Sequence, residues 1–139
     1  MKKVNMLKLV LAEDNLLQRL VLKGLIKQIG GFDLLLEAEN GADLLKKIES
    51  SEILPEICIT DLHMPVMDGL SLTKILKAKY PSIIIFCFTS DSDSAILSQL
   101  IDSGARFIFS KEEPLRMLLE ILRFMENQST RGVAPITNL

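Results

Sequence analysis

The sequence predicts an α/β fold, a (βα)5 doubly wound parallel five-stranded sheet with the strand order 2-1-3-4-5. Short apolar runs alternate five times with longer segments of helical spacing, and this alternation favours a parallel sheet with helices on both faces. The run at residues 83–88 shows no polar alternation, as expected for a strand that is buried on both faces. Right-handed crossovers leave few topologies for such a chain, and the order given above is the one we expect.

The predicted strands are the short apolar runs. They cover residues 7–11, 32–38, 57–59, 83–88 and 107–109. The predicted helices carry apolar residues three and four positions apart, the spacing that places side chains on one helix face. In chain order these sets are Leu17, Leu20, Val21, Leu25 and Ile29; Leu44, Leu45 and Ile48; Leu70, Ile75 and Leu76; Ile96, Leu97, Leu100 and Ile101. The last helix is expected to begin near Pro114, a residue suited to a first helical turn.

The last predicted helix carries more apolar surface than one core face requires. Its apolar residues form one stripe of Leu115, Leu118, Leu119 and Leu122, and a second stripe of Met117, Ile121 and Phe124. We predict that the second stripe forms a homodimer or output interface. The alternative is that this stripe packs on the tail or fills an irregular core.

The end of the chain differs in composition from the rest. Residues 127–139 contain Gly132 and Pro135 and lack helical periodicity. We therefore expect one domain over residues 1–126, followed by a C-terminal tail or linker over residues 127–139.

Composition excludes several classes of protein. The 139 residues suit a single domain. A net charge of -2 offers no basic field for nucleic acid, so DNA would be bound only through an output domain outside this sequence. Cys58 and Cys87 lie in apolar stretches, so we expect them to be reduced residues of the core. Because neither a signal peptide nor a membrane-spanning run is visible, we expect no membrane partner and a cytoplasmic location.

Polar residues follow four of the five predicted strands at the point where each strand ends. Glu13 and Asp14 follow the first strand, Asp61 ends the third, Thr89 and Ser90 end the fourth, and Ser110 and Lys111 end the fifth. In a parallel sheet these carboxyl ends meet at one edge, where ligands bind at the point of topological switch. We therefore expect carboxylates, hydroxyls and one ammonium group to converge there.

Three carboxylates in one small area repel one another unless a cation lies between them. A hard divalent ion with oxygen ligands, Mg²⁺ or Mn²⁺, is the expected metal. Thr89 and Lys111 are not needed for metal binding and fit a phosphoryl group beside it. Asp61, on the central strand, is the expected nucleophile, and the product would be an aspartyl phosphate.

Each of these residues alone has a simpler interpretation. Asp14 or Asn15 would serve as a helix cap, Thr89 as a turn residue and Lys111 as a solvated charge. Their joint placement at the ends of alternating strands favours a shared site. The single histidine, His63, has no second His or Cys nearby, so its ring is not expected to bind the metal.

At this point the residues resemble a known family, the receiver domains of two-component response regulators. The segment from Asp61 to Gly69 resembles the family's D-x-x-M-P-x-M-D-G run at every fixed position. The acidic pair after the first strand, the Thr-Ser pair after the fourth, and Gly104-Ala105 followed by Lys111 match the family's other motifs. The resemblance covers about residues 7–126 and implies the flavodoxin-like, chemotaxis-regulator-like fold.

The resemblance implies a role for each acidic residue. Asp61 would accept a phosphoryl group from a sensor histidine kinase or a histidine phosphotransfer protein. Asp14 would bind Mg²⁺ directly, Glu13 would bind it through water, and His63 would offer its backbone carbonyl. Such a domain catalyses only its own phosphotransfer and dephosphorylation, so it is expected to be a switch and not an enzyme acting on a metabolite.

The resemblance also implies a switch. Thr89 and Lys111 would each bond to a phosphoryl oxygen, and movement of Thr89 would bias the face formed by the fourth helix, fifth strand and fifth helix. The family usually has Tyr or Phe where this chain has Ile108. Strand alternation directs Phe107 and Phe109 to the opposite face of the sheet, so switching at Ile108 must rest on packing alone.

Three other functions fit the pattern less well. A flavin-binding protein of this architecture would cradle a phosphate after the first strand, where Glu13 and Asp14 would repel it. A phosphatase with an aspartate nucleophile typically has a second Asp at the position of His63. A degenerate receiver that binds partners without phosphorylation is disfavoured by the complete set of acidic, hydroxyl and lysine residues, although Ile108 keeps this alternative open.

Overall fold

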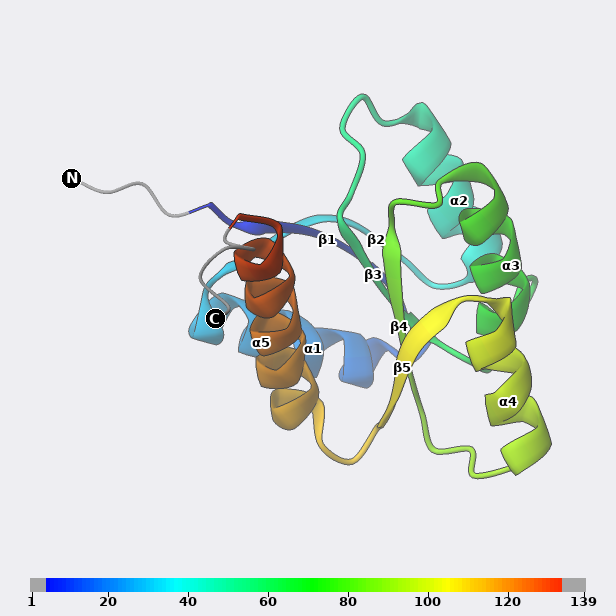
Figure 1. Cartoon of the computed structure of the whole chain (residues 1–139). Helices are drawn as coiled ribbons and strands as arrows, with labels where there is room; N and C mark the ends of the chain where they lie inside the picture. Colours follow the sequence, from blue (N-terminus) through cyan, green and yellow to red (C-terminus); the bar gives the residue numbers. More distant parts are fainter. Residues whose placement is uncertain (1–4, 134–139) are drawn as a thin grey trace.

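The computed structural model describes residues 5–133, with side chains described to residue 128. Its five strands are all parallel and are ordered β2-β1-β3-β4-β5 (Figure 1). They are β1 (Leu7–Ala12), β2 (Phe32–Ala38), β3 (Ile57–Asp61), β4 (Ile84–Thr89) and β5 (Ala105–Ser110). One helix follows each strand: α1 (Leu16–Ile29), α2 (Gly41–Ser50), α3 (Gly69–Lys79), α4 (Ser94–Ser103) and α5 (Pro114–Val133). The predicted fold class and strand order are confirmed.

Two helix layers cover the sheet. In Figure 1, α1 and α5 lie on one face and α2, α3 and α4 on the other. Alternate residues of β1 enter the two layers, with Leu9 and Leu11 in the core under α1 and α5, and Val10 and Ala12 in the core under α2 and α3. All four are fully buried. This two-sided burial explains why the central strands read as continuous apolar runs.

Side-chain caps fix where the helices begin. Asn15 caps α1 by accepting the Gln18 N–H at 2.9 Å, so the helix starts immediately after the acidic pair. Asn40, Asp68 and Asp93 cap α2, α3 and α4 in the same way. These caps satisfy N–H groups that have no partner in the first helical turn, and they hold the helix starts at the carboxyl edge of the sheet.

The loop between β3 and α3 is tightly constrained. The Gly69 N–H donates to the Leu62 carbonyl at 2.8 Å. Pro65 and Met67 close a three-residue turn through a 2.7 Å bond from the Met67 N–H to the Pro65 carbonyl. Between them Val66 has φ 68°, a strained value for a β-branched residue. The loop therefore folds back over the end of β3.

Two predictions about the last helix were wrong. The helix does not end at residue 126 but continues to Val133. Residues 127–133, which were expected to belong to the tail, are therefore helical, and residues 134–139 lie outside the described chain. The second apolar stripe is not an exposed interface, because Met117 and Ile121 are 1% and 0% exposed and pack in the core with Phe124 against them. Leu115 and Leu119, from the first stripe, are instead the exposed ones.

Predictions about the other packed side chains hold. Cys58 and Cys87 are free and buried. Phe107 and Phe109 contact Phe86 on the side covered by α5. Ile108 lies on the opposite side, in the cluster beneath α4, as strand alternation requires.

Candidate functional site

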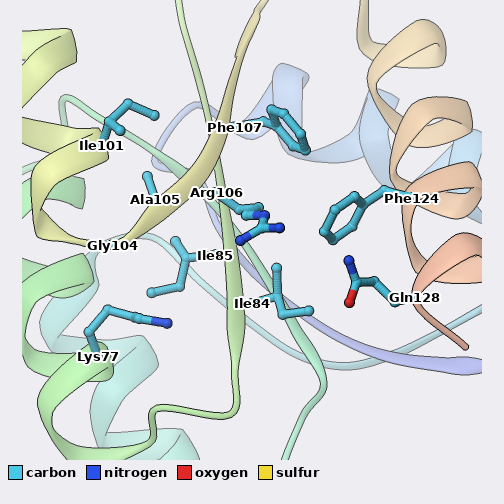
Figure 2. Close-up of a pocket in the computed structure, with 10 residues that line it drawn as sticks. All are labelled: Lys77, Ile84, Ile85, Ile101, Gly104, Ala105, Arg106, Phe107, Phe124 and Gln128. Atoms are coloured by element: carbon cyan, nitrogen blue, oxygen red, sulfur yellow. The ribbon is translucent and has the colours of Figure 1, made fainter. Parts of the chain in front are cut away.

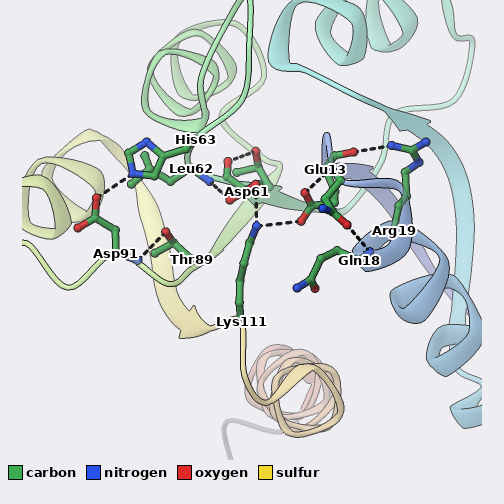
Figure 3. A network of polar contacts seen from close by, with 11 residues as sticks. Glu13, Gln18, Arg19, Asp61, Leu62, His63, Thr89, Asp91 and Lys111 are labelled. Carbon is green, nitrogen blue, oxygen red and sulfur yellow. Dashed lines mark hydrogen bonds and ion pairs between the residues drawn. The ribbon is translucent and has the colours of Figure 1, made fainter.

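Asp61 ends β3, the central strand, and its side chain is almost completely buried. Its two carboxylate oxygens have different partners (Figure 3): Oδ1 accepts the Leu62 N–H at 2.7 Å, and Oδ2 accepts from Lys111 Nζ at 2.8 Å. Its backbone is held by the Thr60 hydroxyl, which donates to the Asp61 carbonyl at 2.8 Å. The carboxylate is therefore fixed in position at the sheet edge.

The predicted acidic cluster forms. Oxygen atoms of Glu13, Asp14 and Asp61 lie within 4.8 Å of one another, with Glu13 and Asp61 buried and Asp14 exposed. Glu13 Oε2 accepts the Asn15 N–H at 2.9 Å. Glu13 Oε1 is 3.2 Å from Lys111 Nζ, but no hydrogen bond satisfies it among the described residues. A buried carboxylate oxygen without a hydrogen bond, beside two more carboxylates, fits a hard divalent cation.

Charge and burial shift the ionisation of the cluster. The pKa of Glu13 is raised from its usual 4.5 to about 7, chiefly by burial and also by the charge of Asp61, while the Asn15 N–H and Lys111 oppose the change. Burial alone would lower the pKa of Lys111, but its bond to Asp61 and the charges of Asp61 and Glu13 outweigh this and raise it. Lys111 is therefore a permanent cation that partly neutralises a carboxylate pair.

The second side of the site comes from β4 and the loop after it. Thr89 is buried, and its Oγ1 accepts the Asp91 N–H at 3.0 Å, which leaves its hydroxyl hydrogen able to point into the site. Asp91 Oδ2 lies 2.8 Å from Nε2 of His63. The Asp93 N–H and then His63 lower the pKa of Asp91. The His63 ring is thus engaged with Asp91, in a direction away from the acidic cluster (Figure 3).

Among the described residues that line this side of the site, Asp91 was not predicted from the sequence motifs. A signal for it exists, since Asp91 lies two residues after Thr89 as His63 lies two after Asp61. The strands β3 and β4 are neighbours, with Asp61 paired to Phe88. The loops that follow these neighbouring parallel strands therefore lie at the same edge of the sheet, where His63 and Asp91 meet.

These side chains line an open pocket of about 460 Å³ at the carboxyl edge. Its walls are formed by Asp14, Asn15, Asp61, His63, Thr89, Ser90, Asp91 and Lys111. Every predicted site residue other than Glu13 and Ile108 lines it. Glu13 lies behind the pocket against Lys111, and Ile108 packs beneath it with Leu62 and Cys87.

A second cavity, of about 600 Å³, lies at the opposite end of β4 and β5 (Figure 2). It is bounded by the first residues of the two strands and by α5, where the Arg106 guanidinium is 5.0 Å from the centre of the Phe124 ring. Among the described residues that line it there is no carboxylate. It is therefore separate from the acidic cluster and carries none of the chemistry proposed for that cluster.

The fold and the site together define a class, a signalling receiver module with a carboxylate–lysine cluster at the end of its central strand. The chain belongs to the response regulator receiver domain family, whose model matches residues 9–123. No helix in residues 5–133 combines the length and the apolar character that crossing a membrane requires.

Several characterised proteins are similar over nearly their full length. The chemotaxis protein CheY of Listeria monocytogenes is 32% identical over 117 residues, which cover 84% of this chain and 96% of that protein. The two-component response regulator ORR41 of Oryza sativa is 30% identical, covering 85% and 95%. Other relatives are longer: the chain spans 31% of a Thermotoga maritima cyclic di-GMP phosphodiesterase to which it is 29% identical.

Solved structures agree with the fold. The non-phosphorylated receiver domain of RcsB from Escherichia coli has a TM-score of 0.79 at 25% identity and covers 89% of this chain and 95% of that one. A DNA-binding response regulator of the LuxR family from Staphylococcus aureus has a TM-score of 0.77 at 27% identity, covering 85% and 97%.

Proposed function

We propose that Asp61 is the phosphoacceptor of this receiver domain and takes its phosphoryl group from a histidine of a sensor kinase or a histidine phosphotransfer protein. The observation that carries the proposal is the 2.8 Å contact between Asp61 Oδ2 and Lys111 Nζ beside the acidic cluster. A fixed carboxylate beside a cation that can neutralise charge on an incoming phosphoryl group supports this role for Asp61.

The donor set supports a Mg²⁺ site, with Mn²⁺ as its substitute. Glu13, Asp14 and Asp61 supply carboxylate oxygens, and the backbone carbonyl of His63 is the proposed fourth ligand, since it belongs to the loop that directly follows β3. Oxygen ligands with several remaining waters suit Mg²⁺. When bound, the ion supplies positive charge for the phosphoryl oxygens. The buried Glu13 Oε1, which faces Lys111 but has no hydrogen bond among the described residues, is the observation that favours such an ion.

The transfer step requires only positioning by the protein. An Asp61 carboxylate oxygen attacks phosphorus, the bond from phosphorus to the donor imidazole nitrogen breaks, and that nitrogen keeps the electron pair and takes a proton. Lys111 stays protonated and pairs with a phosphoryl oxygen. Hydrolysis of the aspartyl phosphate by water restores the Asp61 carboxylate and releases inorganic phosphate. The domain is thus a signalling switch.

The switch residues are proposed to be Thr89 and Ile108. Thr89 has a hydroxyl hydrogen able to reach a phosphoryl oxygen, because the Asp91 N–H already occupies the acceptor side of that hydroxyl. Ile108 packs with Leu62 and Leu100 beneath α4. Movement of Thr89 toward the phosphoryl group would therefore repack an aliphatic cluster under α4 and bias the α4-β5-α5 face. An aromatic rotation is not required.

The partners and location are also proposals. A similar structure contains RcsB dimers bound to DNA, which supports an output role in which nucleic acid is contacted by another domain. A homodimer through α5 would have to use Leu115 and Leu119, because the stripe that the sequence predicted for it is buried. A cytoplasmic location fits a domain whose phosphodonors are kinases and whose cysteines are free.

The test is the intact mass of the full chain after incubation with phosphoramidate, with Mg²⁺ or with a chelator. We expect a gain of one phosphoryl group that requires Mg²⁺ and is absent in Asp61→Asn. Asp93→Asn is the matched control, because residue 93 caps α4 with a side-chain oxygen that Asn retains. If the wild type gains no phosphoryl group although it binds Mg²⁺, the degenerate, partner-binding receiver becomes the better description.

A further inference from the structure

Arg19, in the first turn of α1, has a largely buried side chain that is only 14% exposed. Its guanidinium makes two separate contacts: Nη1 donates to the backbone carbonyl of Glu13 at 2.6 Å, and Nε lies 3.3 Å from Glu37 Oε1. Figure 3 shows the side chain reaching from α1 to the backbone of Glu13 at the acidic cluster. Since Glu37 belongs to β2, Arg19 joins α1 and β2 to the backbone of the acidic pair.

Both backbone polar groups of Glu13 are held by hydrogen bonds. The Glu13 N–H donates to the Ala38 carbonyl at 3.0 Å, and the Glu13 carbonyl accepts from Arg19. That carbonyl lies in the same rigid peptide plane as the backbone nitrogen of Asp14, because each peptide unit is planar from one Cα to the next. The bond from Arg19 therefore restrains the peptide that sets where the Asp14 side chain begins.

Asp14 depends on this restraint more than the other two carboxylates of the cluster do. The carboxylates of Glu13 and Asp61 each accept a hydrogen bond from a backbone N–H group. Within the described part of the chain, no hydrogen bond or ion pair holds the exposed Asp14 carboxylate, yet one of its oxygens lies within 4.8 Å of oxygens from both of the others. Its place in the cluster is therefore set from the backbone, which Arg19 holds.

We propose that Arg19 is a positioning residue for the metal site, holding the peptide between Glu13 and Asp14 so that both carboxylates stay within reach of one cation. The inference rests on the proposed Mg²⁺ site. Residues that hold a metal ligand without contacting the ion typically change the metal affinity when they are removed. The transfer chemistry should depend on Arg19 only through the metal, since among the described contacts neither Asp61 nor Lys111 forms a hydrogen bond or ion pair with Arg19.

A second cation on α1 offers a matched control. Lys23 lies one turn after Arg19, and its Nζ is 2.7 Å from the other carboxylate oxygen of Glu37, Oε2. In the described structure Lys23 forms no hydrogen bond or ion pair with Glu13. If Arg19 served only to tie α1 to β2 through Glu37, replacing either cation would have the same effect. The bond to the Glu13 carbonyl is the contact that distinguishes the two.

The test compares Arg19→Met with Lys23→Met in the full chain. Each variant removes one cation that pairs with Glu37, and Met is a good helix former. The affinity for Mn²⁺ is measured by electron paramagnetic resonance, with Mg²⁺ as the competitor. The rate of phosphorylation by phosphoramidate is measured by intact mass over a range of Mg²⁺ concentrations.

Circular dichroism and urea unfolding establish that each variant is folded before metal binding is compared. If Arg19→Met does not fold, Arg19→Lys takes its place. A single ammonium nitrogen does not reproduce the two separate contacts of the guanidinium, so the Mg²⁺ affinity of Arg19→Lys should fall in the same direction, and the same comparison with Lys23→Met decides.

We expect Arg19→Met to bind Mg²⁺ about tenfold more weakly than the wild type. The Mg²⁺ concentration that gives half the maximal phosphorylation rate should rise by a similar factor, while the rate at saturating Mg²⁺ should fall much less. Lys23→Met should match the wild type in both measurements. Equal Mg²⁺ affinity in Arg19→Met and Lys23→Met would overturn the inference, and so would a lower maximal rate of Arg19→Met at unchanged affinity.

Failure of the proposed function would look different. A wild type that binds metal but gains no phosphoryl group would count against Asp61 as the phosphoacceptor, and the role of Arg19 would still be decided by the metal affinities. A wild type that binds neither Mn²⁺ nor Mg²⁺ would count against the proposed metal site, and the inference would fall with it.

Discussion

Gly69 lies so close to Asp61 that a Cβ at residue 69 would be 2.1 Å from the Asp61 carbonyl oxygen. The contact joins the start of α3 to the end of β3 and is backbone against backbone, so no side-chain rotation relieves it. The position of the Asp61 carboxylate therefore depends on the absence of a side chain eight positions later in the sequence, within the segment that resembles the family motif.

Replacing Gly69 with Ala should displace the end of β3. We expect the unfolding free energy to fall by about 2 kcal/mol and phosphorylation of Asp61 by phosphoramidate to slow, since both depend on the same backbone contact. Gly24→Ala is the control: its new Cβ has nothing within 4 Å, and Ala in an exposed helix should raise stability by about 0.5–1 kcal/mol. Urea unfolding and intact mass measure the two effects, and wild-type behaviour of Gly69→Ala would contradict the prediction.

Lys111→Met should leave Glu13 and Asp61 as a buried carboxylate pair without its cation. Losing one partner of a buried ion pair costs about 3 kcal/mol, and we expect this loss at pH 8 in the presence of a chelator. Adding Mg²⁺ should restore part of it, because the ion replaces the missing positive charge. Lys79→Met is the control, since Lys79 pairs with Glu49 on the surface and its removal should change stability little. Equal stability losses in the two variants would count against the prediction.

When metal is absent, the ionisation of Glu13 should lower the unfolding free energy as the pH rises. The folded-state pKa of about 7 lies above the usual 4.5, so between these values the folded chain binds more protons than the unfolded chain. The contribution of Glu13 is therefore present below pH 4.5 and is lost as the pH approaches 7, by at most about 3 kcal/mol. The measurement is the difference in unfolding free energy between wild type and Glu13→Gln at several pH values in a chelator. If this difference in unfolding free energy is the same at pH 4.5 and pH 7.5, the prediction is refuted.

Both cysteines should resist modification in the folded protein. Burial raises the pKa of the Cys58 thiol far above its usual range and that of Cys87 to about 12, and the thiolate is the reactive form. We expect no adduct with iodoacetamide at pH 8 in native buffer and two adducts in urea, read by intact mass. Rapid labelling of the native chain would show that the core around β3 and β4 opens readily.

Substitution by Asn should destabilise the protein much more on the buried side of α5 than on its exposed side. Ile121 is 0% exposed and belongs to the core cluster, whereas Leu119 is 47% exposed. Ile121→Asn should lower the unfolding free energy by roughly 3 kcal/mol or more, since it removes core packing and buries an amide. Leu119→Asn should cost roughly 1 kcal/mol or less. Thermal unfolding of the two variants measures both losses of unfolding free energy. A larger loss for Leu119→Asn would show that the side of α5 with Leu119, and not the side with Ile121, faces the core.

Most of the fold is predictable from sequence because its signals are local and repeat. Each of the five strands, including Phe32–Ala38 with its expected bounds, appears as a short apolar run, and the carboxyl ends of parallel strands necessarily share an edge. For that reason the sequence alone groups Glu13, Asp14, Asp61, Thr89 and Lys111, and four of them line one pocket with Glu13 behind it.

The orientation of α5 was decided only by tertiary packing. Its sequence offers two adjacent apolar stripes, and helical periodicity alone cannot say which one faces the sheet. The Phe86 ring contacts Phe107, Phe109 and Phe124, so β5 and α5 turn the side with Met117 and Ile121 inward. The stripe predicted to be an interface is therefore part of the core, and the helix is also longer than its weak C-terminal periodicity indicates.

The strand order and the identity of the residues at the carboxyl edge follow from the sequence, because alternation and apolar runs depend on neighbours in the chain. Three features depend instead on tertiary packing: Asp91 meets His63, Glu13 Oε1 has no hydrogen bond among the described residues, and Leu17 and Leu119 face solvent. These relationships join residues on different elements, and their distances depend on how helices pack on the sheet, which no single segment of sequence specifies.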